Sequence, residues 1–523
     1  MVTSIKLPIK FWKKDSGVAE PSEAARKPKQ KINKPSDRNL QFDLFAQLTY
    51  MAAIATARIS RSELFESACK LPYSSTPYFR QVHFLAEKVG IDYAEACRMI
   101  AERTKVEEIR GFLLRLSGAL ASGEDEEEFL KREAGVIADN FTNRYERDVE
   151  SLKKWTDAYV TLVVAAGLIV IVSVISMMIY DVGTGMIVGI AFTMVLVTCL
   201  GAWILYISSP HEVKTRVKGP TSRLQIMATK LFVMLGPLAA TVAALMFLAG
   251  FSLGSILIAG GAILFLPGFL MNRNDGKLSK IDYDIPTVVR VLGGVTSAIG
   301  TTVTQALGQI DKRSMGVLTP EMNRLRYRLD AGIDPKACWD RFVDETGSEL
   351  VERTICMFWD ALSMGADPGK AGEASSVFAA RIAHLRATRS MVAVTFQWLI
   401  LPLHIAMVGL MLFIPQIMTM FTEMINQSAE ALTSNSNSSL PNSSVPIGEL
   451  FAFGNVDLTI INILVTFVVL VLTAANAFAP KAAGGGHNLR IVYNLSIMMI
   501  ITGALMLAIP VFTRSIFQSI VDT

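Results

Sequence analysis

Long apolar runs alternate along this chain with segments of mixed polar and apolar residues. Seven of the runs are long enough to cross a hydrocarbon core, which takes about 20 residues of helix. They are residues 158–180, 186–207, 231–249, 254–271, 391–415, 458–479 and 491–513. The fourth run is the shortest and is rich in glycine, so a re-entrant hairpin with the third run is the alternative to two separate spans. The pattern predicts about seven transmembrane helices.

Two segments outside these runs carry apolar residues at helical spacing. Residues 41–157 precede the first run and are interrupted by turn chemistry, which predicts a bundle of about five helices whose last helix continues into the membrane as a stalk. Residues 272–390 have the same plan before the fifth run. Strand-like alternation is absent from the sequence. We therefore expect an all-α polytopic membrane protein with two duplicated helical bundles.

The two predicted bundles share a repeated motif. Gly-Ile-Asp at 90–92 recurs at 332–334, and Ala-Leu-x-x-Gly-x-Asp at 119–125 recurs at 361–367. The offsets 332 − 90 and 367 − 125 both equal 242, and nine of the 36 positions in this ungapped register are identical. Glycine suits the left-handed residue that ends a helix, and aspartate suits the N-cap of the next one. The motif predicts the same helix boundaries in both copies.

The remaining segments differ in composition. Residues 1–40 are basic and contain several prolines, which is typical of a disordered arm. Residues 158–271 contain the first four spans and a basic loop at 208–230. The fifth span is 391–415, a Ser/Asn-rich loop follows at 416–457, and the last two spans lie in 458–523.

Basic residues predict the orientation, because loops rich in Lys and Arg stay on the cytoplasmic side. With the amino terminus inside, every Lys and Arg except Arg514 falls in a predicted cytoplasmic segment. Residues 419–459 carry none and are expected to lie outside, where three acceptor patterns predict possible N-glycosylation: Asn426, Asn437 and Asn442. The sequence thus predicts a multi-pass protein of the cell membrane with a cytoplasmic amino terminus and two cytoplasmic bundles.

Composition and motifs argue against catalysis. The 523 residues are 51% hydrophobic and 18% charged, with a formal net charge of +4, and the five cysteines have no CxxC or metal-type spacing. No HExxH motif is present, and no GxGxxG motif follows a predicted strand. The segment 365–371 is similar to a phosphate-binding loop, but Met364 and Ala371 stand where Gly and Ser or Thr are required. We expect no enzyme activity, cofactor, metal or nucleic-acid ligand.

A membrane transporter or channel with regulatory cytoplasmic helical domains is the alternative class. Ionisable groups inside spans usually mark ion paths, because burying a charge there is costly. The seven apolar cores contain no Asp, Glu, Lys or Arg, which weakens this alternative. A receptor that senses through residues 419–459 is disfavoured because that loop is of low complexity and lacks a core.

Charged surface segments are candidate partner sites. The acidic run 124–128 opens a helix, where the dipole favours negative charge, so a structural role and a docking role both fit. Arg324, Arg326 and Arg328 place guanidiniums close together on one predicted helix. The basic residues of loop 208–230 are explained by topology and by lipid headgroups.

Two helical bundles that each carry these motifs and each lead into membrane helices resemble the type II secretion F protein superfamily. More closely, the chain resembles the archaeal membrane platform proteins of archaella and type IV pili, over residues 44–160 and 284–397. Residues 357–369 are the most specific stretch, and the helix pair at 231–271 favours the archaeal branch.

The resemblance implies a platform with no activity of its own. It would recruit a hexameric secretion ATPase to its bundles, couple that ATPase to the extraction of pilin-like or archaellin-like subunits from the lipid bilayer, and act as a homodimer. Candidates for docking or coupling are Gly123, Glu124, Asp125, Arg324, Arg326, Arg328, Gly365, Asp367 and Lys370. Bacterial members often read Gly-Glu-x-Ser/Thr-Gly at the second turn, and residues 366–369 depart from this, so no contact role is transferred to an individual residue.

Overall fold

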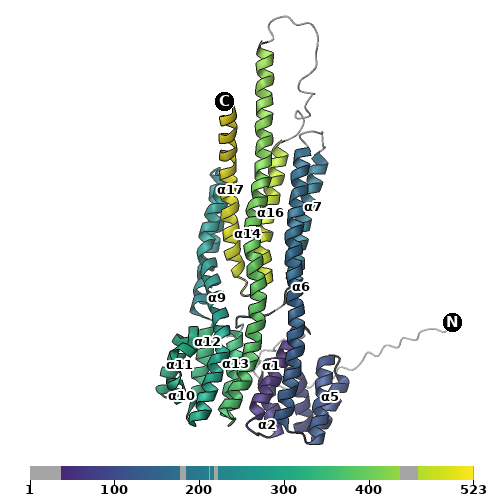
Figure 1. Cartoon of the computed structure of the whole chain (residues 1–523), viewed down its shortest axis with the longest axis vertical. Helices are drawn as coiled ribbons and strands as arrows, with labels where there is room; N and C mark the ends of the chain where they lie inside the picture. The colour runs from purple at the N-terminus through teal and green to yellow at the C-terminus, as the bar shows by residue number, and fades with distance from the viewer. Residues whose placement is uncertain (1–36, 177–183, 211, 217–221, 436–457, 522–523) are drawn as a thin grey trace, which may run out of the picture.

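The computed structural model describes residues 37–176, 184–210, 212–216, 222–435 and 458–521. These residues form an elongated body with two helical bundles at one end and long helices extending from them (Figure 1). No strand occurs among them, and an isolated bridge joins Thr215 to Ser348. The chain is therefore an all-α polytopic membrane protein, which confirms the predicted fold class.

The first bundle contains five short helices and the start of a long one. They are α1 (Asp37–Ala55), α2 (Arg61–Lys70), α3 (Thr76–Phe84) with a π-helical turn at Leu85–Val89, α4 (Tyr93–Arg103), α5 (Glu107–Ser122) and α6 (Glu126–Ser176). Helix α1 thus begins inside the segment expected to belong to the arm. Ser60 and Glu63 form a reciprocal capping box at the start of α2. Phe65, Phe79 and Phe112 are buried and form the centre of the core.

The second bundle follows the same plan. It consists of the end of α9 (Leu253–Ile299), α10 (Val303–Gln309), a 3-10 segment at Lys312–Leu318, α11 (Thr319–Asp330), α12 (Pro335–Thr346), α13 (Glu349–Ser363) and the start of α14 (Pro368–Asn435). Trp339 packs edge-on against Phe342, with ring centroids 5.8 Å apart, and both side chains are buried.

The duplication extends over the whole bundle. Four pairs of corresponding helices begin 242 residues apart. They are α2 and α10 (residues 61 and 303), α4 and α12 (93 and 335), α5 and α13 (107 and 349), and α6 and α14 (126 and 368). The offset predicted from two short motifs is therefore the offset of the helices themselves.

The motif residues have the predicted conformations. Gly90, Gly332, Gly123 and Gly365 have φ values of 78°, 73°, 71° and 89°. Each motif aspartate accepts a hydrogen bond from a backbone N–H of the next helix: Asp92 from Ala94, Asp125 from Glu127, Asp334 from Ala337 and Asp367 from Lys370. The left-handed glycine and the aspartate cap are thus confirmed in both copies.

Three helices belong to a bundle and to the membrane region at once. Helix α6 has 51 residues, α9 has 47 and α14 has 68. At a rise of 1.5 Å per residue, α14 is about 100 Å long. Bundles and spans are consequently not separate units joined by linkers, because the backbone hydrogen bonds of each stalk run through both.

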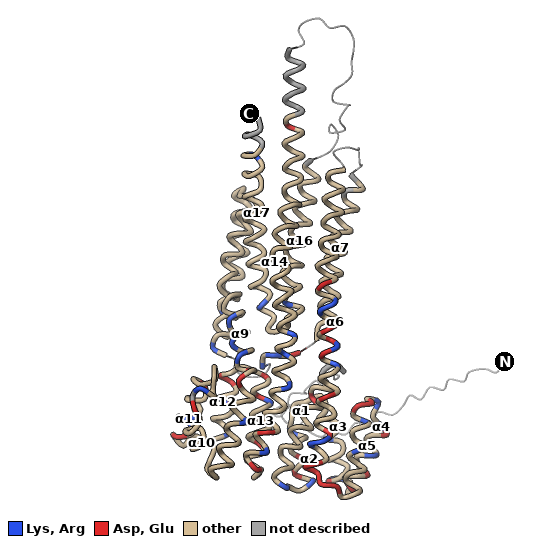
Figure 2. Tube along the Cα trace, in the orientation of Figure 1, with Lys and Arg blue, Asp and Glu red and all other residues tan. Residues whose placement is uncertain are grey.

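Seven described helices are long and apolar enough to cross a membrane. Besides α6, α9 and α14 they are α7 (Thr184–Ser208), α8 (Arg223–Leu248), α16 (Leu458–Gly484) and α17 (Arg490–Val521). Helix α9 runs without a break from its apolar start into the second bundle, so the fourth apolar run is a span of its own. Figure 2 shows the charged residues gathered in the bundles and just above them, with few along the rest of the long helices.

Helix α14 extends further than the sequence indicated. It ends at Asn435, so residues 416–435 of the predicted loop are helical. Met, Gln, Glu and Ala make up nine of these twenty residues, and all four favour helix. Asn426 lies on this helix, whereas Asn437 and Asn442 lie outside the described residues.

The two bundles pack against each other through α1, α13, α6 and α14. The Phe45 and Phe378 rings lie 4.9 Å apart, and Phe378 is fully buried. Arg381 on α14 forms an ion pair with Asp139 on α6. These two positions are equivalent under the 242-residue offset, so corresponding residues of the two stalks contact each other here.

We expect Gly365→Ala to destabilise the protein by about 1 kcal/mol, because an L residue is strained at φ 89° although space is available for its Cβ. Gly135 on α6 also has space around it but has no positive φ. Gly135→Ala should therefore stabilise the protein by roughly 0.5–1 kcal/mol through helix propensity. Thermal unfolding of the purified protein in detergent measures both effects, and equal shifts in the two variants would contradict the conformational argument.

Candidate functional site

Two buried arginines lie where the bundles meet the membrane helices. Arg386 and Arg389 are on α14 and are 4% and 2% exposed. Around them lie the end of α7, the loop that follows it, the middle of α9, the start of α13 and the turn between α16 and α17. We call Arg386, Arg389, Glu212, Asp282 and Glu349 the junction cluster.

Arg386 is shared among three carboxylates. Its Nε donates to Glu212 Oε1 at 2.5 Å and its Nη1 to Asp282 Oδ2 at 2.7 Å, while Nη2 lies 3.5 Å from Glu349 Oε2. Nη2 also donates to the carbonyl oxygen of Val213 at 3.3 Å. One guanidinium therefore joins α14, α9, α13 and the loop after α7.

Arg389 joins α14 to two further elements. Its Nη2 donates to Ser209 Oγ at 2.6 Å, and its Nε donates to the carbonyl oxygen of Ala483 at 3.0 Å. Ser209 Oγ in turn donates to the carbonyl oxygen of Ala482 at 2.7 Å. A Cβ on Gly485 would lie 2.8 Å from Arg389 Nη2, so glycine allows this close approach between the α16–α17 turn and the guanidinium.

Glu212 supplies the charge that Arg386 and Arg389 require. Burial by itself would raise the pKa of this carboxyl, but the two guanidiniums outweigh it and lower the pKa to about 2. Tyr145 on α6 donates its hydroxyl to Glu212 Oε2 at 2.9 Å. The first stalk is thereby connected to the same carboxylate as the second.

The loop after α7 is bound to the second bundle. Backbone hydrogen bonds run from Arg216 N to Gly347 O at 3.2 Å and from Glu349 N to Lys214 O at 3.3 Å. The Arg216 guanidinium pairs with Asp344 and with Glu352. Protein contacts, rather than lipid headgroups, thus account for Arg216 in the basic loop.

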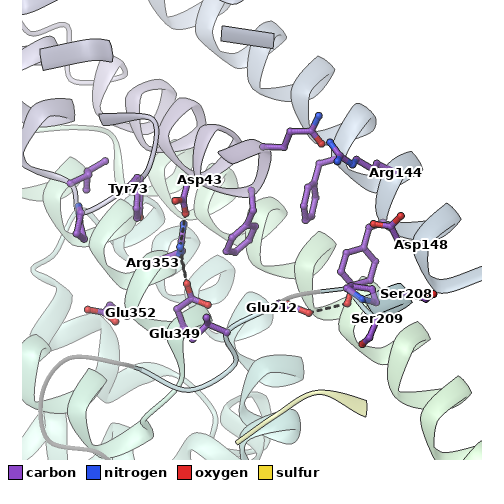
Figure 3. A pocket seen from close by; sticks show the side chains of 18 of the residues that line it. Asp43, Tyr73, Arg144, Asp148, Ser208, Ser209, Glu212, Glu349, Glu352 and Arg353 are labelled. Atoms are coloured by element: carbon purple, nitrogen blue, oxygen red, sulfur yellow. Dashed lines mark hydrogen bonds and ion pairs between the residues drawn. The ribbon is translucent and has the colours of Figure 1, made fainter. Parts of the chain in front are cut away.

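Arg353 fixes the first bundle to the second. Its guanidinium donates to Asp43 on α1 at 2.8 Å and to Glu349 at 2.7 Å. It also lies 4.3 Å from the ring centroid of Phe42 and 4.4 Å from that of Tyr73, within cation–π range. Figure 3 shows Arg353 between Asp43 and Glu349 at the edge of a cavity. Glu349 therefore belongs both to this contact and to the junction cluster.

A polar chain connects four helices inside the membrane region. The Tyr159 hydroxyl donates to Asn476 Oδ1 at 2.8 Å, and Asn476 Nδ2 lies 3.1 Å from His404 Nδ1. His404 Nε2 lies 2.9 Å from Thr502 Oγ1, which lies 2.9 Å from Thr473 Oγ1. Each side chain is bonded to another, so the chain holds α6, α14, α16 and α17 in register.

The two shared turns lie close together at the end of the bundles remote from the membrane helices. Lys370, after the second turn, forms an ion pair of 2.7 Å with Glu127, after the first. Glu124 pairs with Arg132, and Glu126 pairs with Arg61. The acidic run is thus largely neutralised by its own neighbours, and the structure brings Gly123, Glu124, Asp125, Gly365, Asp367 and Lys370 into one region.

The three arginines of α11 form internal pairs. Arg324 and Arg328 both contact Glu345 on α12, and Arg326 contacts Asp330 on its own helix. All three lie in the second bundle, and the guanidiniums of Arg324 and Arg328 hold α11 against α12. Among the described residues, no group of three or more His, Cys, Asp or Glu side chains could hold a metal ion.

Sequence reasoning missed the junction cluster. Arg386 and Arg389 lie just before an apolar run, where basic residues are ordinarily explained by topology. Their spacing of three residues on a helix placed both on one face, which was the available signal. The partners of Arg386 lie 174 and 104 residues away in the chain, at Glu212 and Asp282, and no local pattern links them to it.

We expect Arg386→Met to destabilise the protein by about 3–5 kcal/mol, because it leaves buried carboxylates without their counter-charge. Arg381→Met, five residues earlier on α14, removes an ion pair whose carboxylate is largely exposed and should cost less than about 1 kcal/mol. Thermal unfolding of both variants in detergent tests this. Similar losses of unfolding free energy in the two variants would show that the junction cluster contributes no more to stability than an exposed ion pair does.

Stability should also depend on pH through Lys214. Burial lowers the pKa of this amine from 10.5 to about 8. Between these values the unfolded chain binds a proton that the folded chain does not, so stability rises as pH rises from about 8 to 10.5. Lys214→Met should remove this part of the rise, whereas Lys154→Met, at an exposed pair on α6, should retain it. Unfolding midpoints at pH 7.5 and 9.5 measure the difference, and identical slopes in both variants would refute the assignment.

Part of the chain is similar in sequence to two known proteins. No protein-family model matches the chain, and no solved structure matches it. The chain is 28% identical over 320 residues to Flagella accessory protein J of Methanocaldococcus jannaschii, covering 59% of this chain and 57% of that protein. It is 23% identical over 312 residues to the protein of the same name from Methanococcus voltae, covering 56% and 54%. The chain thus spans about half the length of the curated relatives it matches, and it is similar over that part to two archaeal proteins named as flagella accessories.

Proposed function

We propose that this chain is the membrane platform of an archaeal type IV filament machine, an archaellum or a pilus. Its bundles bind a hexameric secretion ATPase, and its membrane helices act on pilin-like or archaellin-like subunits that are drawn from the bilayer into a filament. The observation that carries the proposal is the similarity to proteins named Flagella accessory protein J. The resemblance noted in the sequence supports the same assignment and adds a homodimer as the working assembly.

The architecture supports a mechanical role. Stalk helices that run unbroken from bundle to membrane transmit a displacement, because bending a helix disrupts its backbone hydrogen bonds. The junction cluster and Arg353 connect both bundles to both stalks, so a load applied to one bundle reaches α6, α9 and α14 together. No catalytic residue is required in the platform for such a role.

Transport of a solute is the alternative function. The polar chain around His404 is the feature of the membrane region that comes nearest to a pathway. Its members are bonded to one another across four helices, which suits packing better than passage. A flux assay with the purified protein in vesicles separates the two functions, since a platform should give no flux.

We propose that the amino terminus and both bundles face the cytoplasm and that the end of α14 faces outside. Most basic residues lie on the bundle side (Figure 2), as expected for cytoplasmic segments. A cysteine in place of exposed Ser279 should be protected from an impermeant thiol reagent in intact cells, and a cysteine in place of Ser436, which lies outside the described residues, should react. The reverse labelling pattern would overturn the orientation.

Loss of the junction cluster should abolish filament assembly. We expect cells in which the gene carries Arg386→Met to lack filaments, while cells with Arg381→Met assemble them. The first change removes the ion pairs that hold α9, α13 and the loop after α7 to α14, and the second removes an exposed ion pair. Electron microscopy of cells with matched membrane levels of the two variants provides the measurement. Normal filaments with Arg386→Met, or after deletion of the gene, would contradict the proposed function.

A further inference from the structure

A cavity of about 540 Å³ lies between the two bundles and the end of α7. It is the cavity beside Arg353 in Figure 3, with Arg144 and Asp148 on its opposite side. Its walls come from the start of α1, the residues 71–73 after α2, the middle of α6, residues 207–210 and 212–213, and α13. Aromatic side chains, namely Phe42, Tyr73, Phe141 and Tyr145, form much of the wall.

The internal duplication explains why space remains there. Arg144 and Ser151 on α6 correspond to Arg386 and Ala393 on α14 at the 242-residue offset, and α1 corresponds to residues 279–297 of α9. In the second copy, α9 continues beyond this part towards its apolar start and packs along α14, with Asp282 bound to Arg386. In the first copy the counterparts of residues 271–278 are residues 29–36, which lie outside the described residues, and the described structure leaves the position beside Arg144 and Ser151 open.

Several polar groups of the cavity have no partner in the described structure. Gln41 Oε1 and Arg353 Nη1 are buried and make no hydrogen bond with another described residue. The exposed charges of Arg144 and Asp148 likewise have no ion-pair partner in the described part of the chain. The unmet groups include guanidinium donors, an amide acceptor and a carboxylate. A peptide offers groups for all of them, whereas a simple anion or cation would meet part of the set.

We propose that residues 24–36 of this same chain occupy the cavity. Of these residues 29–36 are the counterparts of residues 271–278 of α9, and they directly precede α1, whose Gln41 and Phe42 line the cavity. The segment contains five basic residues and no acidic residue. A segment of this composition offers backbone carbonyl oxygens to Arg144 and Arg353, backbone N–H groups to Gln41, lysines to Asp148, and the apolar side chain of Ile32 to the aromatic wall.

A segment bound in the cavity would add a third connection, besides the junction cluster and Arg353. A basic segment in this position would contact α1, α6, α13 and the end of α7 at once, and would thereby strengthen the contact between the two bundles. The inference depends on the duplication and on the cavity, and it stands whether or not the chain is a filament platform.

Photo-crosslinking of the full-length protein in its own membranes tests the proposal. With a photoreactive amino acid in place of Ile32, mass spectrometry should find adducts on cavity residues of the same chain, such as Tyr73, Phe141 or Ser151. The same photoreactive amino acid in place of Val89, on an exposed part of the first bundle, is the positional control and should give none of these adducts.

Two charge variants measure the contribution of ion pairing. Asp148→Arg, or Lys31→Gln with Lys34→Gln, should lower the adduct yield about fivefold, the change that corresponds to roughly 1 kcal/mol of ion pairing. Asp157→Arg, further along α6 and outside the cavity, should leave the yield unchanged. The lysine variants leave the described helices untouched, so a fold defect cannot explain their result. Adducts on lipid or on another protein, or equal yields in all variants, would overturn the proposal.

Discussion

The architecture depends on charge buried at the junction between bundles and membrane helices. Two guanidiniums removed from water are tolerated only where carboxylates and carbonyl oxygens surround them. Glu212, Asp282 and Glu349 supply the carboxylates, and each comes from a different part of the chain. The loop after α7, the middle of α9 and the start of α13 must therefore all be in place for Arg386 to be satisfied. This requirement determines how the second bundle sits on the membrane helices.

The two copies of the bundle are attached differently. The glutamates at positions 107 and 349 are equivalent in the duplication, yet the side chain of Glu107 is 85% exposed and that of Glu349 is 14% exposed. Glu349 belongs to the junction cluster, and the second bundle, which contains it, has two stalks, α9 and α14. Among the described residues the first bundle has one stalk, α6, and it is connected to the junction through Arg353 and Tyr145. The two described copies are thus attached to the membrane helices unequally.

Sequence patterns predicted the features that arise from local chemistry. Apolar length identified the spans, and the glycine and aspartate of the repeated motif identified helix boundaries in both copies, because left-handed backbone and N-caps are properties of a few adjacent residues. The junction cluster could not be predicted in the same way, since Arg386 and Glu212 become neighbours only when α7, α9 and α14 pack. The acidic run 124–128 shows the reverse case. Its composition suggested a free docking patch as one possibility, and Arg61, Arg132 and Lys370 instead pair with three of its members.

The central claim is that this chain is a non-catalytic platform that acts through a bound ATPase. The most direct test is ATP hydrolysis measured with the full-length chain in lipid nanodiscs, alone and together with the purified secretion ATPase of the same cells. The account predicts no turnover by the chain alone and a higher rate of hydrolysis when chain and ATPase are combined. Turnover by the chain alone that Lys370→Ala abolishes would contradict it, and so would an ATPase that neither binds the chain nor changes its rate.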